Sequence, residues 1–413
     1  MAGFFPIFFK GYWSHGVNAN LSTARLGIAN AAAGLIIALL APVLGAMADS
    51  AGIRKRLLIC FAYLGVVTTA ALFLIQQGQW LLAAACYVLA TVGFSGGNIF
   101  YDALLAHIAP ANRIHVVSGT GFAFGYLGGG LLLLFNVVMT LSPHSFGLPD
   151  PQSAVRWSFL TVALWWGLFS VLTILWVPPD PKPLRPARLA VTIKDGLQRV
   201  VATLTHLRHQ KTILYFLIGY WFYIDGVDTI IRMAVDYGLA LGFHSNDLIV
   251  ALLVVQFVGF PAALVFGRLG QRWGALRAVY IAIVIYMAVT VWGVMIDRKI
   301  EFYILAVAIG LVQGGVQALS RSYYAGLVPK DQSAAYFGLY NMLGKFAVII
   351  GPALMGAVGL AARAVMMPAH PTALQMEAVG QAASRWSMAS ILLLFVLGIV
   401  FLRLSQRASR QYP

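Results

Sequence analysis

Eleven apolar runs, each long enough for a membrane-spanning helix, constrain the fold of this chain more than any other feature. A helix needs about 20 apolar residues to cross the roughly 30 Å of hydrocarbon in a bilayer. The runs are Leu26–Ala48, Leu57–Gln76, Trp80–Ile108, Val116–Leu141, Trp157–Val177, Ile213–Tyr237, Leu248–Leu269, Val279–Ile296, Phe302–Val328, Tyr336–Leu360 and Trp386–Leu402. Hydrophobic residues make up 60% of the chain and charged residues only 10%, whereas a soluble domain carries about 25% charged residues. We therefore predict an all-α polytopic membrane protein.

A shorter apolar segment, Met1–Trp13, precedes these runs and brings the expected number of spans to about twelve. At 1.5 Å per residue it covers only about 20 Å. Gly45 and Gly52 recur 222 positions later as Gly267 and Gly274. With Met1–Trp13 counted as the first span, Ile213–Tyr237 is the seventh, and when it is shifted back by the same offset its start falls before the first residue. We therefore expect the first span to be truncated at its N-terminus.

A second repeat relates the fourth and fifth spans to the tenth and eleventh. Five positions correspond in order, each 219 residues later, and four of them keep the same residue. The pairs are Gly96 and Gly315, Asp102 and Arg321, Pro110 and Pro329, Gly119 and Gly338, and Gly125 and Gly344. The repeat predicts two pseudo-symmetric six-helix halves, residues 1–177 and 212–413. It also places Asp102 and Arg321, which carry opposite charges, at equivalent positions.

The connection between the halves, residues 178–211, has a composition of its own. Five prolines within Pro178–Pro186 predict an extended segment. Apolar residues then recur at helical spacing between Leu189 and Leu204, with basic residues between them. This pattern predicts an amphipathic helix that lies on the inner face of the membrane.

The net charge of +15 comes from basic residues in the loops between apolar runs. Eighteen of them fall on one side of the predicted spans and seven on the other. Because cytoplasmic loops are enriched in Lys and Arg, we expect both termini and the linker in the cytoplasm. The expected location is the inner membrane of a bacterial cell, and this charge pattern argues against nucleic-acid binding. Cys60 and Cys86 lie inside apolar runs without metal-ligand spacing, so we expect no metal and no cofactor.

One loop motif, G-x-x-x-D-x-x-G-x-R-K, closes the second span. Its residues are Gly45, Asp49, Gly52, Arg54 and Lys55. Small residues allow close helix approach, and the tight turn needs a glycine that can adopt positive φ. The carboxylate can hold the basic residues of the loop or face the N-terminus of a neighbouring helix. An ordinary positively charged inner loop is the alternative.

The motif resembles the loop signature of the major facilitator superfamily, a group of twelve-helix secondary transporters built from two halves. Its position between the second and third spans, and a degenerate copy between the eighth and ninth, support the resemblance. One departure is that Ile53 stands where an Arg is usual. The resemblance implies that this loop belongs to a gate.

Four further stretches resemble the bacterial relatives of the yeast vacuolar effluxer of autophagy. They are Gly97–Pro110, Ser118–Gly130, Tyr220–Ile231, and Val312–Ser322 together with Phe337–Pro352. The resemblance implies export of amino acids or similar small metabolites, because the eukaryotic member is associated with leucine and other amino acids leaving the vacuole. Members of this family usually carry an Asp-Trp-Ala-Asn-type motif in the first span, and this chain begins after it.

Charged residues within the apolar runs are candidates for substrate or proton binding, because a charge at this depth costs about 2.5 to 3.5 kcal/mol. Asp225 lies in the seventh span next to Gly226, which permits a bend. It is a candidate proton carrier or ammonium ligand, and a hydrogen-bonded structural acid is the alternative. Asp228 and Arg232 are four residues apart and neutralise each other in the simplest interpretation.

Asp102 is either a proton carrier or the partner of Arg54 or Lys55 in an inner gate. Arg321 offers a planar guanidinium that suits a carboxylate, with a capping role as the alternative. Lys345 in the eleventh span needs an acid, and Asp225 or Asp102 is the expected partner. Uncharged candidates that line a cavity or bond between helices are Asn98, Tyr101, Tyr223, Gln317 and Asn341.

These features predict a secondary active transporter that works by alternating access and exports amino acids or similar metabolites, with proton coupling through Asp225. A proton-coupled drug or sugar exporter is one alternative, and a non-transporting membrane sensor is another. We expect no enzyme, because no cluster of His, Ser and acidic residues converges at one membrane face. The expected partners are a small-molecule substrate, protons and the lipid bilayer, and the expected state is a monomer.

Overall fold

The computed structural model describes residues 4–180, 205, 207–240, 245–296, 298–368 and 372–411. Within these residues, eleven helices are long and apolar enough to cross a membrane, which confirms the predicted all-α membrane class. Large apolar side chains such as Leu39, Val67 and Leu164 are exposed, as expected of helix faces that contact lipid. The predicted amphipathic helix of the linker lies outside the described residues.

The elements follow the predicted runs. They are α1 (Phe4–Phe8), η1 (Phe9–Trp13), α2 (Ala19–Ala51), α3 (Arg54–Ala71), η2 (Leu72–Leu74), α4 (Trp80–Ile108), η3 (Ala111–Arg113), α5 (Ile114–Leu141), η4 (Pro143–Phe146), α6 (Pro151–Trp176), α8 (Lys211–Ala240), α9 (Ser245–Trp273), α10 (Ala275–Val294), α11 (Lys299–Leu327), η5 (Lys330–Gln332), α12 (Ser333–Met366) and α13 (Ala373–Gln411).

The chain forms two compact units. Unit 1 comprises Met1–His107, Leu131–Leu204 and Pro329–Met342. Unit 2 comprises Ile108–Gly130, Thr205–Val328 and Leu343–Pro413. The first turns of α12 therefore belong to unit 1, and the first half of α5 belongs to unit 2. The division into residues 1–177, 178–211 and 212–413 remains a prediction.

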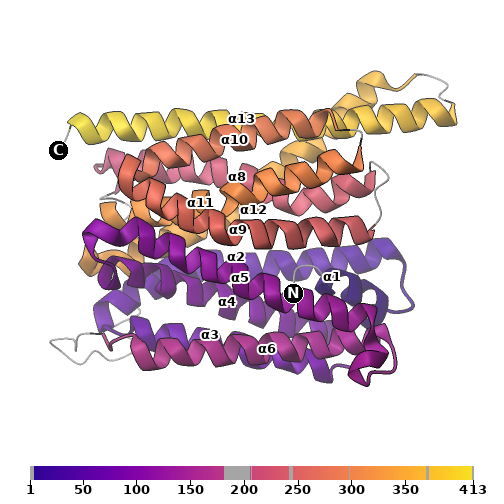
Figure 1. The fold of residues 1–413 in the computed structure, drawn as a ribbon, viewed down its shortest axis with the longest axis horizontal. Helices are drawn as coiled ribbons and strands as arrows, with labels where there is room; N and C mark the ends of the chain where they lie inside the picture. Colours follow the sequence, from indigo (N-terminus) through magenta and orange to yellow (C-terminus); the bar gives the residue numbers. More distant parts are fainter. Residues whose placement is uncertain are drawn as a thin grey trace. The chain divides into compact units, whose positions relative to one another are not determined.

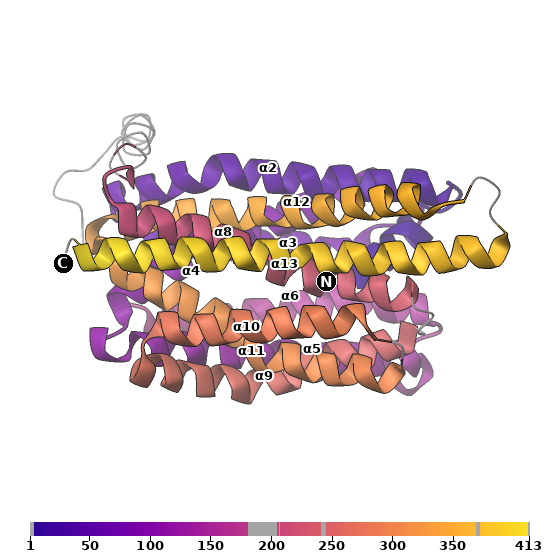
Figure 2. The same ribbon diagram turned by 90° about the horizontal axis from the view of Figure 1, so that it is seen from above.

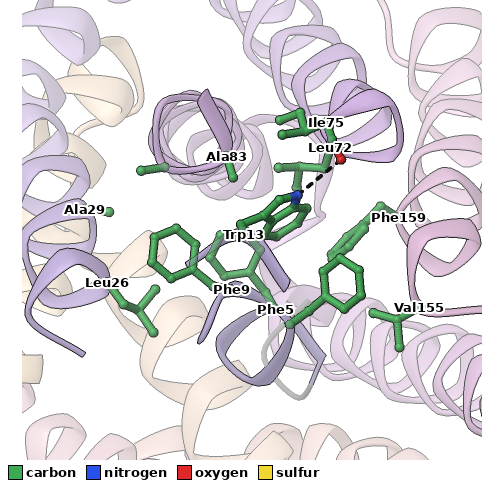
Figure 3. Packing of buried hydrophobic residues seen from close by; sticks show 12 residues of the cluster. Phe5, Phe9, Trp13, Leu26, Ala29, Leu72, Ile75, Ala83, Val155 and Phe159 are labelled. Carbon is green, nitrogen blue, oxygen red and sulfur yellow. Dashed lines mark hydrogen bonds between the residues drawn. The ribbon is translucent and has the colours of Figure 1, made fainter. Parts of the chain in front are cut away.

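In unit 1, α3 packs along α6 (Figure 1). Gly65 of α3 makes room for the indole of Trp166, because a β-carbon on this glycine would overlap the ring. An aromatic cluster forms around Trp13 (Figure 3), where the ring of Phe159 lies 5.4 Å from that of Trp13. The indole nitrogen of Trp13 donates a hydrogen bond to the carbonyl of Ile75 at 3.3 Å. This bond satisfies the polar atom of an otherwise apolar core.

In unit 2, α9, α10 and α11 pack against one another (Figure 2), and α8 packs along α13. Glycines again set the close approaches. A β-carbon on Gly219 of α8 would lie 3.1 Å from the carbonyl oxygen of Gly398 in α13. A β-carbon on Gly315 of α11 would overlap the ring of Phe266 in α9. Small residues are the usual means by which membrane helices pack closely.

The two units contain the same helix crossing. In unit 1, a β-carbon on Gly338 of α12 would lie 2.5 Å from the carbonyl oxygen of Ala41 in α2. In unit 2, a β-carbon on Gly119 of α5 would lie 2.7 Å from the carbonyl oxygen of Ala263 in α9. The offsets of 219 and 222 residues relate these two pairs. The residues shared by the two copies of the repeat are therefore the ones that let the backbones touch.

The turns after α2 and α9 also correspond. Gly52 ends α2 with φ of +59°, and Gly274 precedes α10 with φ of +90°. Both angles lie in the left-handed region that favours glycine. The prediction of a glycine with positive φ in this turn is confirmed for Gly52.

Candidate functional site

Asp49 of α2 caps the beginning of α12 within unit 1. Its two carboxylate oxygens accept the backbone N–H groups of Ala334 and Ala335 at 3.2 and 2.8 Å. The side chain is only 1% exposed. A carboxylate at a helix N-terminus satisfies orphan amides and interacts favourably with the helix dipole. Of the roles predicted for this acid, the structure places it at a neighbouring helix N-terminus and also beside Arg54.

Arg54, the first residue of α3, contacts Asp49 and three further side chains of unit 1. Its guanidinium lies 3.7 Å from Asp49 and donates hydrogen bonds to Asp180 and Ser333, each at 3.2 Å, and to His107. His107 also bonds the Ser333 hydroxyl at 2.9 Å. We call Asp49, Arg54, His107, Asp180 and Ser333 the anchor network. It joins the ends of α2, α4 and α6 to the starts of α3 and α12.

Lys55 adds contacts between α3 and α6. Its backbone N–H donates to Asp180 at 2.8 Å, and its ammonium donates to the carbonyls of Ile174 and Val177. Lys55 therefore caps the C-terminus of α6, where exposed carbonyls favour a cation. Sequence reasoning missed Asp180, because an acid that follows the proline-rich end of a helix carries no positional signal of its own.

Asp102 lies in the C-terminal part of α4, and its carboxylate accepts a hydrogen bond from the Asn341 amide of α12 at 3.1 Å. The same amide nitrogen donates to the carbonyl of Phe337 at 3.0 Å. Two predicted candidates are thus in contact within unit 1. Asn98 is half-buried and Tyr101 is exposed on the same helix.

Arg321 occupies the equivalent place in unit 2. Its Nε donates to the Ser118 hydroxyl at 3.1 Å and its Nη2 donates to the Ser118 carbonyl at 3.2 Å. The guanidinium carbon lies 4.6 Å from the centre of the Phe122 ring, which is a cation–π contact. Next to it, His115 bonds the hydroxyl of Ser322 at 2.8 Å.

The 219-residue offset relates Phe122 to Asn341 and Ser118 to Phe337. The two sites are therefore equivalent in position, and their chemistry differs. Once the contact between Asp102 and Asn341 is known, the offset indicates Phe122 as the equivalent partner of Arg321.

Asp225 is completely buried in α8. Both carboxylate oxygens lie 3.0 Å from the backbone nitrogen of Gly351, which donates to them, and the Thr229 hydroxyl donates at 3.2 Å. A side chain on Gly351 would overlap Thr229, so the glycine is needed for this approach. The next residue, Pro352, lies inside α12 and has no N–H to donate. The acid thus holds α12 where its helical hydrogen bonding is interrupted.

The remaining predicted candidates lie on α8, α11 and α12. Tyr223 is completely buried, and its hydroxyl shares a 2.6 Å hydrogen bond with Ser320. Gln317 accepts from the Tyr126 hydroxyl at 3.4 Å. Asp228 and Lys345 are half-buried. The side chain of Arg232 lies outside the described residues.

These groups can hold charge, protons or hydrogen bonds in an apolar interior. Among the described residues, no group of three or more His, Cys, Asp or Glu side chains has the arrangement of a metal site. Both cysteines are free. The buried carboxylates, amides and hydroxyls described above suit the reversible binding of a polar solute or a proton.

Known proteins match this chain over most of its length. The family model described as "Vacuole effluxer Atg22 like" matches residues 22–115 and 107–368. The "Uncharacterized MFS-type transporter YxiO" of Bacillus subtilis is 36% identical over 400 residues, which cover 96% of this chain and 88% of that protein. "Autophagy-related protein 22" of Yarrowia lipolytica is 25% identical over 276 residues, which cover 60% of this chain and 46% of that protein.

A solved structure shows the same fold. The major facilitator superfamily transporter FucP, in its outward conformation, aligns with a TM-score of 0.68 at 13% identity. The alignment covers 98% of this chain and 97% of that chain.

Proposed function

The chain belongs to the family of vacuole effluxer Atg22-like proteins, and from that premise we propose that it exports an amino acid or a similar small metabolite. It is a membrane transporter of the major facilitator superfamily. The proposed cycle is alternating access, in which the two halves rock about a central substrate site. The proposed driving force is the proton gradient, with Asp225 as the proton carrier.

The contact between Asp225 and Gly351 is the observation that carries this proposal. A carboxylate accepts an N–H more strongly in its charged form than in its neutral form. Proton uptake by Asp225 therefore weakens the hold of α8 on α12 at Gly351–Pro352. Because a carboxylic acid has only one free acceptor oxygen and a hydroxyl that must find an acceptor, the contact has two distinct states. A contact of this kind links proton binding to helix movement.

The experiment uses the purified chain in proteoliposomes with a panel of labelled amino acids. Counterflow measures exchange without a driving force, and accumulation under an imposed pH gradient measures coupling. We expect Asp225→Asn to retain counterflow and to lose gradient-driven accumulation. Asp247→Asn is the matched control, because Asp247 is an acid of the same unit that contacts Tyr303 and Lys299 at the start of α9 and α11.

Two results would contradict the proposal. Gradient-driven accumulation that survives Asp225→Asn would exclude this residue as the proton carrier. If labelled sugars or drugs show counterflow and no amino acid does, the result would favour the alternative function, a proton-coupled exporter of drugs or sugars.

The proposal extends to orientation and assembly. The anchor network then faces the cytoplasm, together with both termini and the linker, in the cell membrane of a bacterium. The transporter acts as a monomer. A C-terminal fusion to green fluorescent protein should fluoresce, and a fusion to alkaline phosphatase should be inactive. The opposite pair of results would place the C-terminus outside the cytoplasm and contradict the proposed orientation.

A further inference from the structure

Tyr286 of α10 is a completely buried tyrosine whose hydroxyl has no hydrogen-bond partner among the described residues. Its ring stacks on Phe395 of α13, with centroids 5.7 Å apart and planes 23° apart. The stacking restrains the ring, so the phenol oxygen keeps its position. Buried hydroxyls are nearly always paired, because leaving one unpaired is costly. An unpaired hydroxyl held in a fixed place suggests a binding role.

Gln313 of α11 presents a second group of this kind. Its amide oxygen is buried and has no hydrogen-bond partner among the described residues. Gln317 follows one turn later, and residues four apart share a helix face. α10 and α11 pack against each other within unit 2. Two amide groups therefore lie one turn apart on α11, a helix that packs against the helix of Tyr286.

Tyr126 of α5 is positioned against the same face of α11. Its ring fits into a notch formed by two glycines, because a β-carbon on Gly259 or on Gly314 would lie 2.8 or 2.7 Å from ring atoms. Its hydroxyl reaches Gln317 at 3.4 Å. A bond of this length is weak, so a better partner can replace it at little cost.

Asp228 of α8 provides the charge. It interacts electrostatically with Tyr126 and with Tyr286. Four helices of unit 2 thus bring together one carboxylate, two phenol hydroxyls and two amides. We call Asp228, Tyr126, Tyr286, Gln313 and Gln317 the tyrosine cluster. Carboxylate, amide and phenol oxygens all accept hydrogen bonds, and an ammonium group has three N–H donors and a positive charge.

We propose that the tyrosine cluster binds the ammonium group of the transported solute. The inference rests on the proposed function for its substrate class, and it adds a ligand group and three residues, Tyr126, Tyr286 and Gln313. Asp228 supplies the counter-charge, and the oxygens of Tyr286 and Gln313 accept the remaining N–H bonds. The cluster recognises the ammonium group wherever the rest of the solute is bound.

The experiment measures binding of simple probes to the purified full chain in detergent. Amino-acid amides, such as leucinamide and glycinamide, keep the ammonium group and lack the carboxylate. The matching deaminated acids, such as 4-methylpentanoate, lack the ammonium group. We expect the amides to raise the midpoint of thermal unfolding in a saturable manner and the deaminated acids to have no effect.

Variants then assign the site. We expect Asp228→Asn to abolish the shift and Tyr286→Phe to weaken amide binding about tenfold, because a bond to a charged donor is lost. Tyr286→Phe should leave the unfolding midpoint without ligand unchanged, since its hydroxyl bonds nothing among the described residues. Tyr280→Phe, on the same helix, is the matched control, because the Tyr280 hydroxyl donates to Gln406 at 3.4 Å instead. It should bind the amides like the wild type.

Three results would overturn the inference. They are binding of the deaminated acids as tight as that of the amides, full amide affinity in Tyr286→Phe, and no shift with any ammonium probe. Failure of the proposed export is a separate outcome. A chain that binds amides through Asp228 and transports no amino acid would refute the export and support the tyrosine cluster.

Discussion

The helix crossings of the two units have the same backbone geometry and different polar chemistry. In unit 1, α2 and α12 meet at Gly45 and Gly338, and in unit 2, α9 and α5 meet at Gly267 and Gly119. The repeat offsets relate each glycine of one crossing to a glycine of the other. Close contact between backbones favours small residues at these positions, and the clearance is smaller at Gly45 than at Gly267.

The charged residues beside the crossings have diverged. Asp49 caps α12 in unit 1, and its counterpart Gln271 is exposed in unit 2. Asp102 contacts Asn341 in unit 1, and its counterpart Arg321 contacts Phe122 in unit 2. The residues needed for helix packing are therefore the same in the two units, whereas the polar side chains beside them differ. The differences between the units are the places to look for function.

The largest expected effect comes from adding a methyl group to each crossing. A β-carbon on Gly45 would overlap the backbone carbonyl of Ala334, which cannot move without shifting α12. A β-carbon on Gly267 would lie 3.1 Å from the carbonyl oxygen of His115, a contact that a small adjustment relieves. We expect Gly45→Ala to lower the free energy of unfolding by about 3 kcal/mol and Gly267→Ala by under about 1 kcal/mol. Unfolding in mixed micelles measures both.

Gly125→Ala is the control for this pair, since a β-carbon on Gly125 would have no neighbouring atom within 4 Å. Alanine is a better helix former by about 1 kcal/mol, so this variant should be neutral or more stable. Equal losses in Gly45→Ala and Gly267→Ala would show that the two crossings are equally tight, which would contradict the difference in clearance between the two glycines.

The second largest effect is expected when the helix cap of unit 1 is removed and the result is compared with the same change at the equivalent residue of unit 2. Asp49→Ala leaves two N–H groups of α12 without an acceptor and removes a counter-charge of Arg54. We expect a loss of about 2 kcal/mol in the free energy of unfolding, because hydrogen bonds to charged groups contribute about 1.5 to 3 kcal/mol. Gln271→Ala, at the exposed equivalent position, should change it by less than about 0.5 kcal/mol.

Asp49→Asn refines this second test. An asparagine can cap a helix and lacks the charge that attracts Arg54. A free energy of unfolding between those of the wild type and Asp49→Ala would show that both the helix cap and the ion pair with Arg54 contribute. If Asp49→Ala were as stable as the wild type, the anchor network would have no role in holding α12.

The sequence predicted the parts of this structure that depend on spacing. Run lengths predicted the eleven membrane-length helices of the described residues, and the offset of 219 residues predicted that Gly119 and Gly338 are equivalent. The glycine requirement at Gly52 followed from the tight turn. These inferences succeeded because helix length, close packing and positive φ each demand a residue type that is recognisable on its own.

The partners of the charged residues could not be predicted in the same way. Arg54 bonds Asp180 and Ser333, which lie 126 and 279 positions away. Such pairings depend on where the chain turns in space, and many acids and hydroxyls are equally suitable by type. Phe122 carries no charge to mark it as a partner of Arg321, although a guanidinium commonly stacks on aromatic rings.

The third effect tests the buried arginine of unit 2. Arg321→Lys keeps the charge and loses the planar pair of donors that reaches both oxygens of Ser118. We expect a loss of about 1 kcal/mol in the free energy of unfolding. A double-mutant cycle with Ser118→Ala measures the part that depends on this contact. A coupling energy near zero would show that Arg321 is held by other groups.

The smallest effect is expected at the matching site of unit 1. Asp102→Asn is close to isosteric, and the new amide oxygen can still accept the hydrogen bond from Asn341, so the free energy of unfolding should change by only about 0.5 kcal/mol.

The charge of this half-buried group is lost, however, and any charge-dependent role in transport is lost with it. Counterflow and gradient-driven accumulation in proteoliposomes, measured beside Arg321→Lys, distinguish the two sites. If Asp102→Asn transports like the wild type and Arg321→Lys does not, transport needs the planar guanidinium of unit 2 and does not need the charge of Asp102. If both variants transport normally, neither the charge of Asp102 nor the planar guanidinium of Arg321 is part of the transport cycle, and the divergence of these equivalent positions needs another explanation.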